Sequence, residues 1–183
     1  SFYFDIRKDV LYCDSLNSSK RKNCVIVLNI ILESLLKWFA PILAFTTDEI
    51  YELLNKKEDC IHEQEFVKIP QNWQNDELNE KWSKLFKIKQ EANVAIEEKR
   101  SNKIIGSSLE AEITIRTSPE NYKLFDGLDL AEYFITSKAD KINSNKNDDL
   151  TIEVKKAKGD KCPRCWKILT TKCQRCAEAI KSQ

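Results

Sequence analysis

The chain has 183 residues, of which 42% are hydrophobic and 32% charged, so it can build a core in one or two domains. Its 30 Lys and Arg nearly balance its 29 Asp and Glu, and the net charge of +1 excludes a uniformly basic nucleic-acid binder. Three widely spaced glycines exclude a glycine-rich phosphate loop, and the one histidine, His62, lacks the second histidine of a metalloprotease motif.

The first predicted helix covers residues 17–39, where apolar side chains recur every three or four residues. Asn17 or Ser18 can cap its first turn, and Pro41 prevents it from continuing.

Two further helices are predicted before residue 101. A capping box of Thr46 and Glu49 indicates a short second helix, and the polar stretch 55–70 that follows indicates an ordered loop. Asn75 is the predicted N-cap of a long third helix over 76–100, which has one apolar face and one charged face.

Strand periodicity appears after residue 110. Apolar and polar residues alternate over 111–116 and again over 150–155, which predicts two strands, and 133–142 is a further strand candidate. A short helix is predicted from Ser118 to Gly127, and 144–149 is a polar loop.

These elements predict an α+β protein with three parts. A mainly α-helical bundle over 1–110 is followed by a small α/β unit over 111–158 and by a cysteine-bearing tail over 159–183.

Seven cysteines and no secretory segment favour a reducing compartment over a disulfide framework. Cys13, Cys24 and Cys60 are scattered, and we expect them to be ordinary core or loop cysteines. The other four lie within fifteen residues.

These four cysteines form two C-x-x-C pairs, Cys162 with Cys165 and Cys173 with Cys176. Two such pairs complete a tetrahedral Cys₄ zinc site, and because four ligands leave no open position, the site would be structural. A thioredoxin-like redox pair or two disulfides are the alternatives, and the doubled motif without a βαβ pattern favours zinc. Metal binding would supply on the order of 10 kcal/mol to a tail too small to fold by core burial alone.

Basic and aromatic residues alternate with these cysteines. The tail carries six basic and two acidic residues, which suits contacts to phosphates and stacking on an unpaired base. The alternative for the tryptophan is that it packs beneath the zinc site. The candidate RNA contacts in the tail are Arg164, Trp166, Lys167, Lys172 and Arg175.

A second candidate set lies near the start of the first predicted helix, whose N-terminal N–H groups can also bind phosphate. Its members are Arg7, Lys8, Lys20, Arg21 and Lys22. The alternative is that Arg7 and Lys8 pair with Asp5 and Asp9 and that the lysine cluster is only solvated.

Four segments, in order along the chain, resemble bacterial-type isoleucyl-tRNA synthetases. The sequences at 3–13 and 40–50 resemble that family's anticodon-binding helical domain, 105–111 matches a further segment, and 150–176 resembles its zinc-bearing C-terminal end. The chain departs from the family at Val10, where Arg is frequent, and in a shorter segment between the two cysteine pairs.

The resemblance implies a parent enzyme that uses ATP to activate isoleucine and esterify it to tRNA(Ile). The family's HIGH and KMSKS signatures are absent here, so no catalytic residue is expected and the region should be inactive alone. The implied cofactor is one structural Zn²⁺, with ATP bound only in the catalytic domain. The implied partners are tRNA(Ile) and the catalytic and editing domains of the same chain.

Three further expectations concern context. The complete lack of Met indicates a region of a longer protein. No apolar run is long enough to span a membrane. We expect the protein to be a cytoplasmic monomer. The alternative function is a zinc-ribbon adaptor whose helical bundle docks a protein partner. A similar cysteine-rich zinc motif lies at the C-terminal end of some DNA glycosylases, but none of their catalytic residues is recognisable here.

Overall fold

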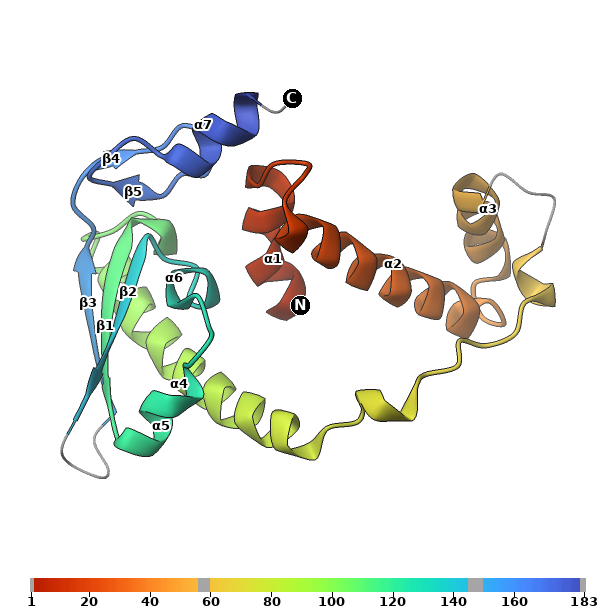
Figure 1. Ribbon diagram of the computed structural model, residues 1–183, viewed down its shortest axis with the longest axis horizontal. Coiled ribbons are helices and arrows are strands. Elements are labelled where there is room, and N and C mark those ends of the chain that lie inside the picture. The colour runs from red at the N-terminus through yellow and green to blue at the C-terminus, as the bar shows by residue number, and fades with distance from the viewer. Residues whose placement is uncertain (1, 56–59, 145–149, 182–183) are drawn as a thin grey trace. The chain divides into compact units, whose positions relative to one another are not determined.

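The computed structural model describes residues 2–55, 60–144 and 150–181 (Figure 1). Its residues form two compact units, one made of 17–74 and the other of 1–16 together with 75–183. The predicted fold class is confirmed, because the structure is mainly helical, carries a small mixed sheet and ends in the cysteine cluster. The division at residues 110 and 158 stays a prediction about independent folding.

The 17–74 unit contains helices α2 (Ser19–Phe39) and α3 (Ala44–Asn55) and the 3₁₀ turns η1 (Ile61–Glu63) and η2 (Gln71–Trp73). The Ser18 hydroxyl caps α2 by accepting from the Arg21 N–H at 3.3 Å, as predicted.

The predicted start of the second helix was wrong. The Thr47 N–H donates to the Leu43 carbonyl at 3.0 Å, so the helical bonds begin before Thr46, which lies inside α3. Of the predicted 55–70 loop, residues 56–59 lie outside the described part of the chain, and η1 occupies part of the remainder.

The second unit is built on two helices, α1 (Phe2–Cys13) and α4 (Asp76–Ser101). The Asn75 side chain caps α4 by accepting from the Leu78 N–H at 2.8 Å, which confirms the predicted start. Helix α1 was not predicted.

A three-stranded sheet follows α4 in the order β2–β1–β3, with β1 (Ala111–Thr117) at its centre. Strand β2 (Lys138–Asn143) runs parallel to β1, and β3 (Thr151–Lys156) runs antiparallel to it. The crossover from β1 to β2 contains the short helices α5 (Pro119–Leu124) and α6 (Leu130–Tyr133).

Two boundaries in this region differ from prediction. Helix α5 ends at Leu124 rather than Gly127, which lies in the following turn with φ +79°. The strand expected from residue 133 begins at Lys138, because Tyr133 ends α6 and Ile135, with φ +57°, turns the chain towards the sheet. Of the predicted loop at 144–149, residues 145–149 lie outside the described chain.

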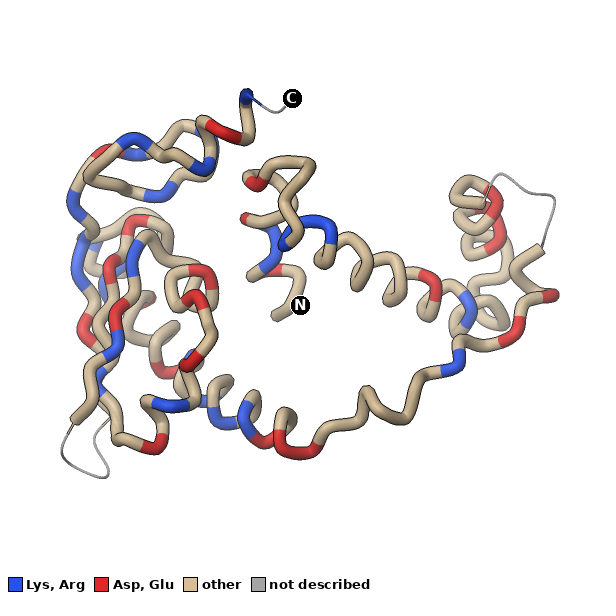
Figure 2. The backbone as a smooth tube through the Cα atoms, viewed as in Figure 1, with Lys and Arg blue, Asp and Glu red and all other residues tan. Residues whose placement is uncertain are grey.

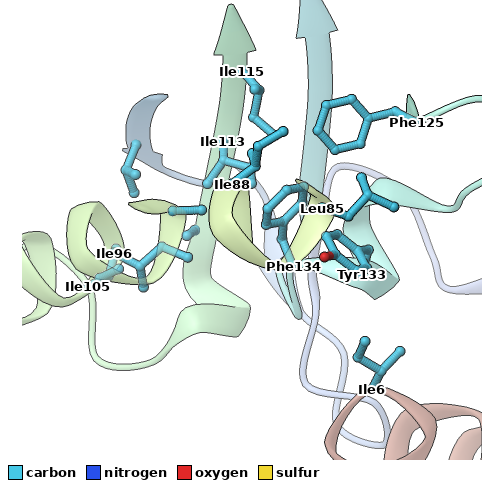
Figure 3. Packing of buried hydrophobic residues seen from close by; sticks show 13 residues of the cluster. Ile6, Leu85, Ile88, Ile96, Ile105, Ile113, Ile115, Phe125, Tyr133 and Phe134 are labelled. Carbon is cyan, nitrogen blue, oxygen red and sulfur yellow. The ribbon is translucent and has the colours of Figure 1, made fainter. Parts of the chain in front are cut away.

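One hydrophobic cluster holds this unit together, and it joins α1, α4, the sheet and the crossover (Figure 3). Alternate residues of β1 are fully buried, as the strand periodicity predicts. Aromatic residues from the crossover fill the space between the sheet and α4. The cluster includes Ile6, Leu85, Ile88, Ile96, Ile113, Ile115, Phe125, Tyr133 and Phe134.

Lys89 is a buried cation beside this core. Its ammonium group donates to the Tyr133 carbonyl and lies 5.1 Å from the Phe2 ring centre and 5.0 Å from that of Tyr133. Burial lowers the pKa of Lys89 from 10.5 to about 8. Folding therefore opposes protonation of this amine.

Lys89→Met is expected to change how stability depends on pH. Below pH 8 the wild-type amine is charged in both states and the folded state bears the full desolvation penalty, which disappears as the pH rises to 10.5. The wild type should therefore gain roughly 1–2 kcal/mol relative to the variant between pH 7 and 10, after allowance for solvent screening. Urea unfolding of both proteins measures this difference. The exposed Lys87→Met is the control, and a flat difference for Lys89→Met would contradict the prediction.

Candidate metal centre and nucleic-acid interface

The tail folds as a hairpin followed by a helix. Strands β4 (Asp160–Lys161) and β5 (Ile168–Leu169) pair antiparallel, and α7 (Gln174–Lys181) follows them. Gly159 adopts φ +123°, and a Cβ there would lie 2.1 Å from the Leu169 carbonyl oxygen, so the hairpin requires glycine at this position. The hairpin carries the first cysteine pair, and the start of α7 carries the second.

All four predicted ligands come together. The sulfur atoms of Cys162, Cys165, Cys173 and Cys176 lie within 4.8 Å of one another, and Cys165 Sγ is 3.9 Å from Cys173 Sγ. Every cysteine of the chain is a free thiol, so the cluster is not a pair of disulfides. A set of four thiols at this spacing fits a tetrahedral metal ion.

The surroundings of the cluster shift the pKa values of its thiols in different directions. Burial raises the pKa of Cys165 and of Cys176. At Cys162 burial acts in the same direction, but the backbone N–H groups of Cys165 and Arg164 outweigh it and lower the pKa to about 7. The Cys162 thiol therefore ionises more readily than an ordinary cysteine, and a bound cation would favour ionisation of all four thiols.

Arg175 ties the second cysteine pair to α1. Its guanidinium bonds both carboxylate oxygens of Asp9, at 2.6 and 2.8 Å, and reaches Asp14 at 3.3 Å. Although burial opposes ionisation of Asp9, the arginine keeps its pKa below the ordinary value of 3.8. A bidentate Arg–carboxylate pair fixes orientation as well as distance.

Arg164 ties the first cysteine pair to the C-terminal end of the same helix. Its guanidinium donates to the Tyr12 carbonyl at 2.9 Å and to the Cys13 carbonyl, and it contacts Cys176 Sγ at 3.9 Å. Cys13 belongs to the same buried cluster as these cysteines, and burial raises its pKa to about 11. The last turn of α1 therefore packs beside the four-cysteine cluster.

Trp166 directly follows the first cysteine pair, and its side chain points outward. It is 60% exposed, adopts φ +64°, and donates its backbone N–H to the Cys162 carbonyl at 3.0 Å. Its side chain is therefore not the small core beneath the cluster. Lys and Arg recur along the tail (Figure 2), and Lys161 Nζ lies 5.9 Å from the indole ring centre. Lys172 is exposed and Lys167 half-buried.

A groove of about 420 Å³ runs beside this tryptophan, between α1, α6 and the segment 164–167 that contains Cys165. Ile6 and Ile135 are apolar, Trp166 supplies an aromatic surface, and the basic Lys8 and Lys167 lie among the acidic Asp5, Asp9 and Glu132. The mixed charges give the groove no clear preference for an anion, so its main feature is the aromatic surface of Trp166.

The second candidate set is divided between the units. Arg7 pairs with the buried Glu132 at 2.7 Å rather than with Asp5 or Asp9, and Lys8 pairs with Asp5 at 2.9 Å. The remaining three, at the start of α2 in the 17–74 unit, are Lys20 and Lys22, which are exposed, and Arg21, which is half-buried.

Sequence reasoning missed the partners of the two tail arginines. Asp9, Asp14 and the carbonyls of Tyr12 and Cys13 lie some 150 residues away along the chain. No periodicity links such positions. It also missed Lys161, although the excess of basic residues in the tail could have indicated it.

Comparisons with known proteins agree with the resemblance. The model of the family "Anticodon-binding domain of tRNA ligase" matches residues 1–115. An isoleucine–tRNA ligase of Pelagibacter ubique is 51% identical over 96% of this chain and 19% of its own length. Those of Gluconobacter oxydans and Caldanaerobacter subterraneus are 34% and 36% identical, over 98% and 100% of this chain and 20% and 22% of theirs. The chain thus spans about a fifth of these relatives.

Proposed function

The chain belongs to the anticodon-binding domain family of tRNA ligases, and from this premise we propose that it is the tRNA-binding C-terminal region of an isoleucyl-tRNA synthetase. In this role it recognises the anticodon stem-loop of tRNA(Ile). The parent protein performs ATP-dependent isoleucylation in its catalytic domain, and the catalytic and editing domains are partners in the same chain. We further propose that the parent is a cytoplasmic monomer. Among the described helices, each is too short or too polar to cross a membrane.

The exposed indole of Trp166 is the observation that carries this proposal. It stands next to a thiol cluster that fits a metal ion, and the clamps made by Arg164 and Arg175 fix that cluster on α1. An unpaired base can stack on the indole while Lys161, Lys167 and Lys172 attract phosphates. A rigid platform of this kind suits one RNA loop better than a long duplex.

Zn²⁺ is the ion proposed for the cluster, since four thiolates prefer a soft, tetrahedral metal. It would supply folding free energy to the tail and take no part in chemistry. Because Arg164 and Arg175 already bond α1, we propose that Trp166 and the lysines supply most of the RNA contacts of the tail and that the arginines position them.

A filter-binding comparison of cognate tRNA with an anticodon-swapped tRNA tests the proposal. The cognate tRNA should bind more tightly, and both affinities should fall as salt rises, because phosphate contacts release counterions. Trp166→Ala should weaken cognate binding roughly five- to a hundredfold, the worth of one stacked base. Trp73→Ala, an exposed tryptophan of the 17–74 unit, is the matched control.

Equal affinity for the two tRNAs would overturn anticodon recognition. The zinc-ribbon adaptor would be favoured instead if the protein ignored RNA and chelation abolished only its association with a protein. The exposed basic and aromatic residues of the tail favour RNA between these alternatives.

A further inference from the structure

A second group of metal-ligating side chains lies in the 17–74 unit. The Asp48 carboxylate, the Cys60 thiol and the His62 imidazole place one donor atom each within 4.8 Å of the other two. Asp48 comes from the first turns of α3, and the other two come from the start of η1. The only histidine of the chain and a cysteine outside the tail cluster thus meet at one carboxylate.

The backbone holds this group in place. Cys60 and His62 flank Ile61, which is 2% exposed and packs with Leu36 and Ala40 in the core of the unit. The Ile61 N–H donates to Asp48 Oδ1 at 3.0 Å. The buried isoleucine therefore anchors the turn, while the residues on either side of it reach the carboxylate.

The turn itself is also closed by hydrogen bonds. The Cys60 carbonyl accepts from the Glu63 N–H at 3.2 Å and from the Gln64 side chain at 3.4 Å, and the Gln64 N–H donates to the Ile61 carbonyl at 3.1 Å. Two of the three donors are thus on one braced turn and the third is on a helix. The three donor atoms therefore need to move only a little to coordinate one metal ion.

We propose that Asp48, Cys60 and His62 bind a second Zn²⁺ ion. Thiolate, imidazole and carboxylate are all zinc ligands, and the sulfur and nitrogen donors disfavour Mg²⁺ and Ca²⁺. In a tetrahedral site donors lie about 3.3–3.8 Å apart, as zinc–ligand bonds of 2.0–2.3 Å require. The present spacing reaches this with shifts of about 1 Å.

Binding needs only a hydrated Zn²⁺ ion from solution. The thiol of Cys60 loses its proton to solvent, the imidazole binds as the neutral base, and the carboxylate replaces a water molecule. Asp48 can keep the bond from Ile61 because a carboxylate has four lone-pair sites. The fourth zinc position stays with water, unlike the closed Cys₄ site.

A bound metal ion would stabilise the 17–74 unit, whose hydrophobic core is small. Its main buried cluster consists of Leu36, Ala40 and Ile61, supported by partly buried Leu32, Ile50 and Tyr51. A cross-link between α3 and η1 adds stability where burial supplies little. The inference does not depend on tRNA binding, so either can fail without the other.

Zinc analysis of the full chain, after dialysis against a weak chelator, tests the inference. We expect two zinc ions per chain, which is one more than the sequence predicts. Cys60→Ser and His62→Ala should each bind one. Asp48→Asn should also weaken the second site, although its amide oxygen can still accept from the Ile61 N–H and keep the turn folded.

Glu63→Gln, which changes an exposed charge beside His62 without removing a ligand, should retain two. Substitution by Co²⁺ gives a second readout, because the thiolate-to-metal absorption should reflect five sulfur ligands and fall by about a fifth in Cys60→Ser. One zinc ion in the wild type would overturn the inference. A second ion that persists in Cys60→Ser and His62→Ala would overturn it equally, since that ion would lie elsewhere.

Discussion

Cys176→Ser is expected to release one zinc ion per chain and to unfold the tail from Gly159 onward. The side chain is 3% exposed, and its sulfur belongs to the four-thiol cluster. A hydroxyl is a poor zinc ligand, and the tail has little else to bury, so the loss of metal removes on the order of 10 kcal/mol of local folding free energy.

The unfolding should stay local. The cluster that joins α1, α4 and the sheet contains no tail residue, and it should keep most of the helical circular dichroism. Hydrogen exchange should then show rapid exchange in α7 and in the β4–β5 hairpin, with continued protection in α4 and β1. Chelation of the wild type should give the same pattern.

Cys24→Ala is the matched control, because it removes a buried thiol in the other unit and leaves the cluster intact. It should keep its zinc and its cognate tRNA affinity, whereas Cys176→Ser should bind cognate tRNA roughly ten- to a hundredfold more weakly as the stacking platform is lost. Loss of all helical signal in Cys176→Ser would show that the tail is not a separate folding unit and would contradict the predicted boundary at residue 158.

Local patterns carried most of what the sequence could predict. The two C-x-x-C pairs place four thiols within fifteen residues, the side chains of Ser18 and Asn75 cap helices, and the alternation over 111–116 continues through the whole of β1. In each case the relevant interaction is between residues close in the chain, so periodicity or spacing suffices.

Helix α1 shows a local signal that was overlooked. Ile6, Val10 and Cys13 recur at intervals of four and three residues, which is helical spacing, and all three are buried. The pairing of Arg175 with Asp9 is different in kind, because it joins residues 166 positions apart and depends on the path of the whole chain between them. Nor could the sequence show that Cys60 and His62 meet a carboxylate from α3.

The Asp9–Arg175 clamp is expected to contribute strongly to docking of the tail on α1. Asp9 retains 20% of its side-chain exposure and Arg175 34%, and the pair makes two bonds in parallel. Breaking a fully buried ion pair costs about 3–5 kcal/mol, and partial exposure reduces this to roughly 2–3 kcal/mol for Arg175→Gln. The same loss is expected for Asp9→Asn.

A double-mutant cycle isolates the pair. If the two residues stabilise the tail through each other, the double variant should lose little more than either single variant, with a coupling free energy of about 1.5–2.5 kcal/mol. Arg175→Lys is the matched control for charge, since it keeps the cation but loses the bidentate geometry and should recover only part of the loss. Zinc content should stay unchanged in all four proteins, because no ligand is altered.

The coupling of this ion pair should not change between pH 7 and pH 5. The folded pKa of Asp9 lies below 3.8, so its contribution is complete above that value and is lost as the pH falls through the folded pKa. Hydrogen exchange of α7 should therefore give the same coupling at pH 7 and at pH 5. Additive losses at pH 7 would show that Arg175 stabilises the tail without Asp9. The tail would then be held on α1 mainly by Arg164 and its two carbonyl contacts.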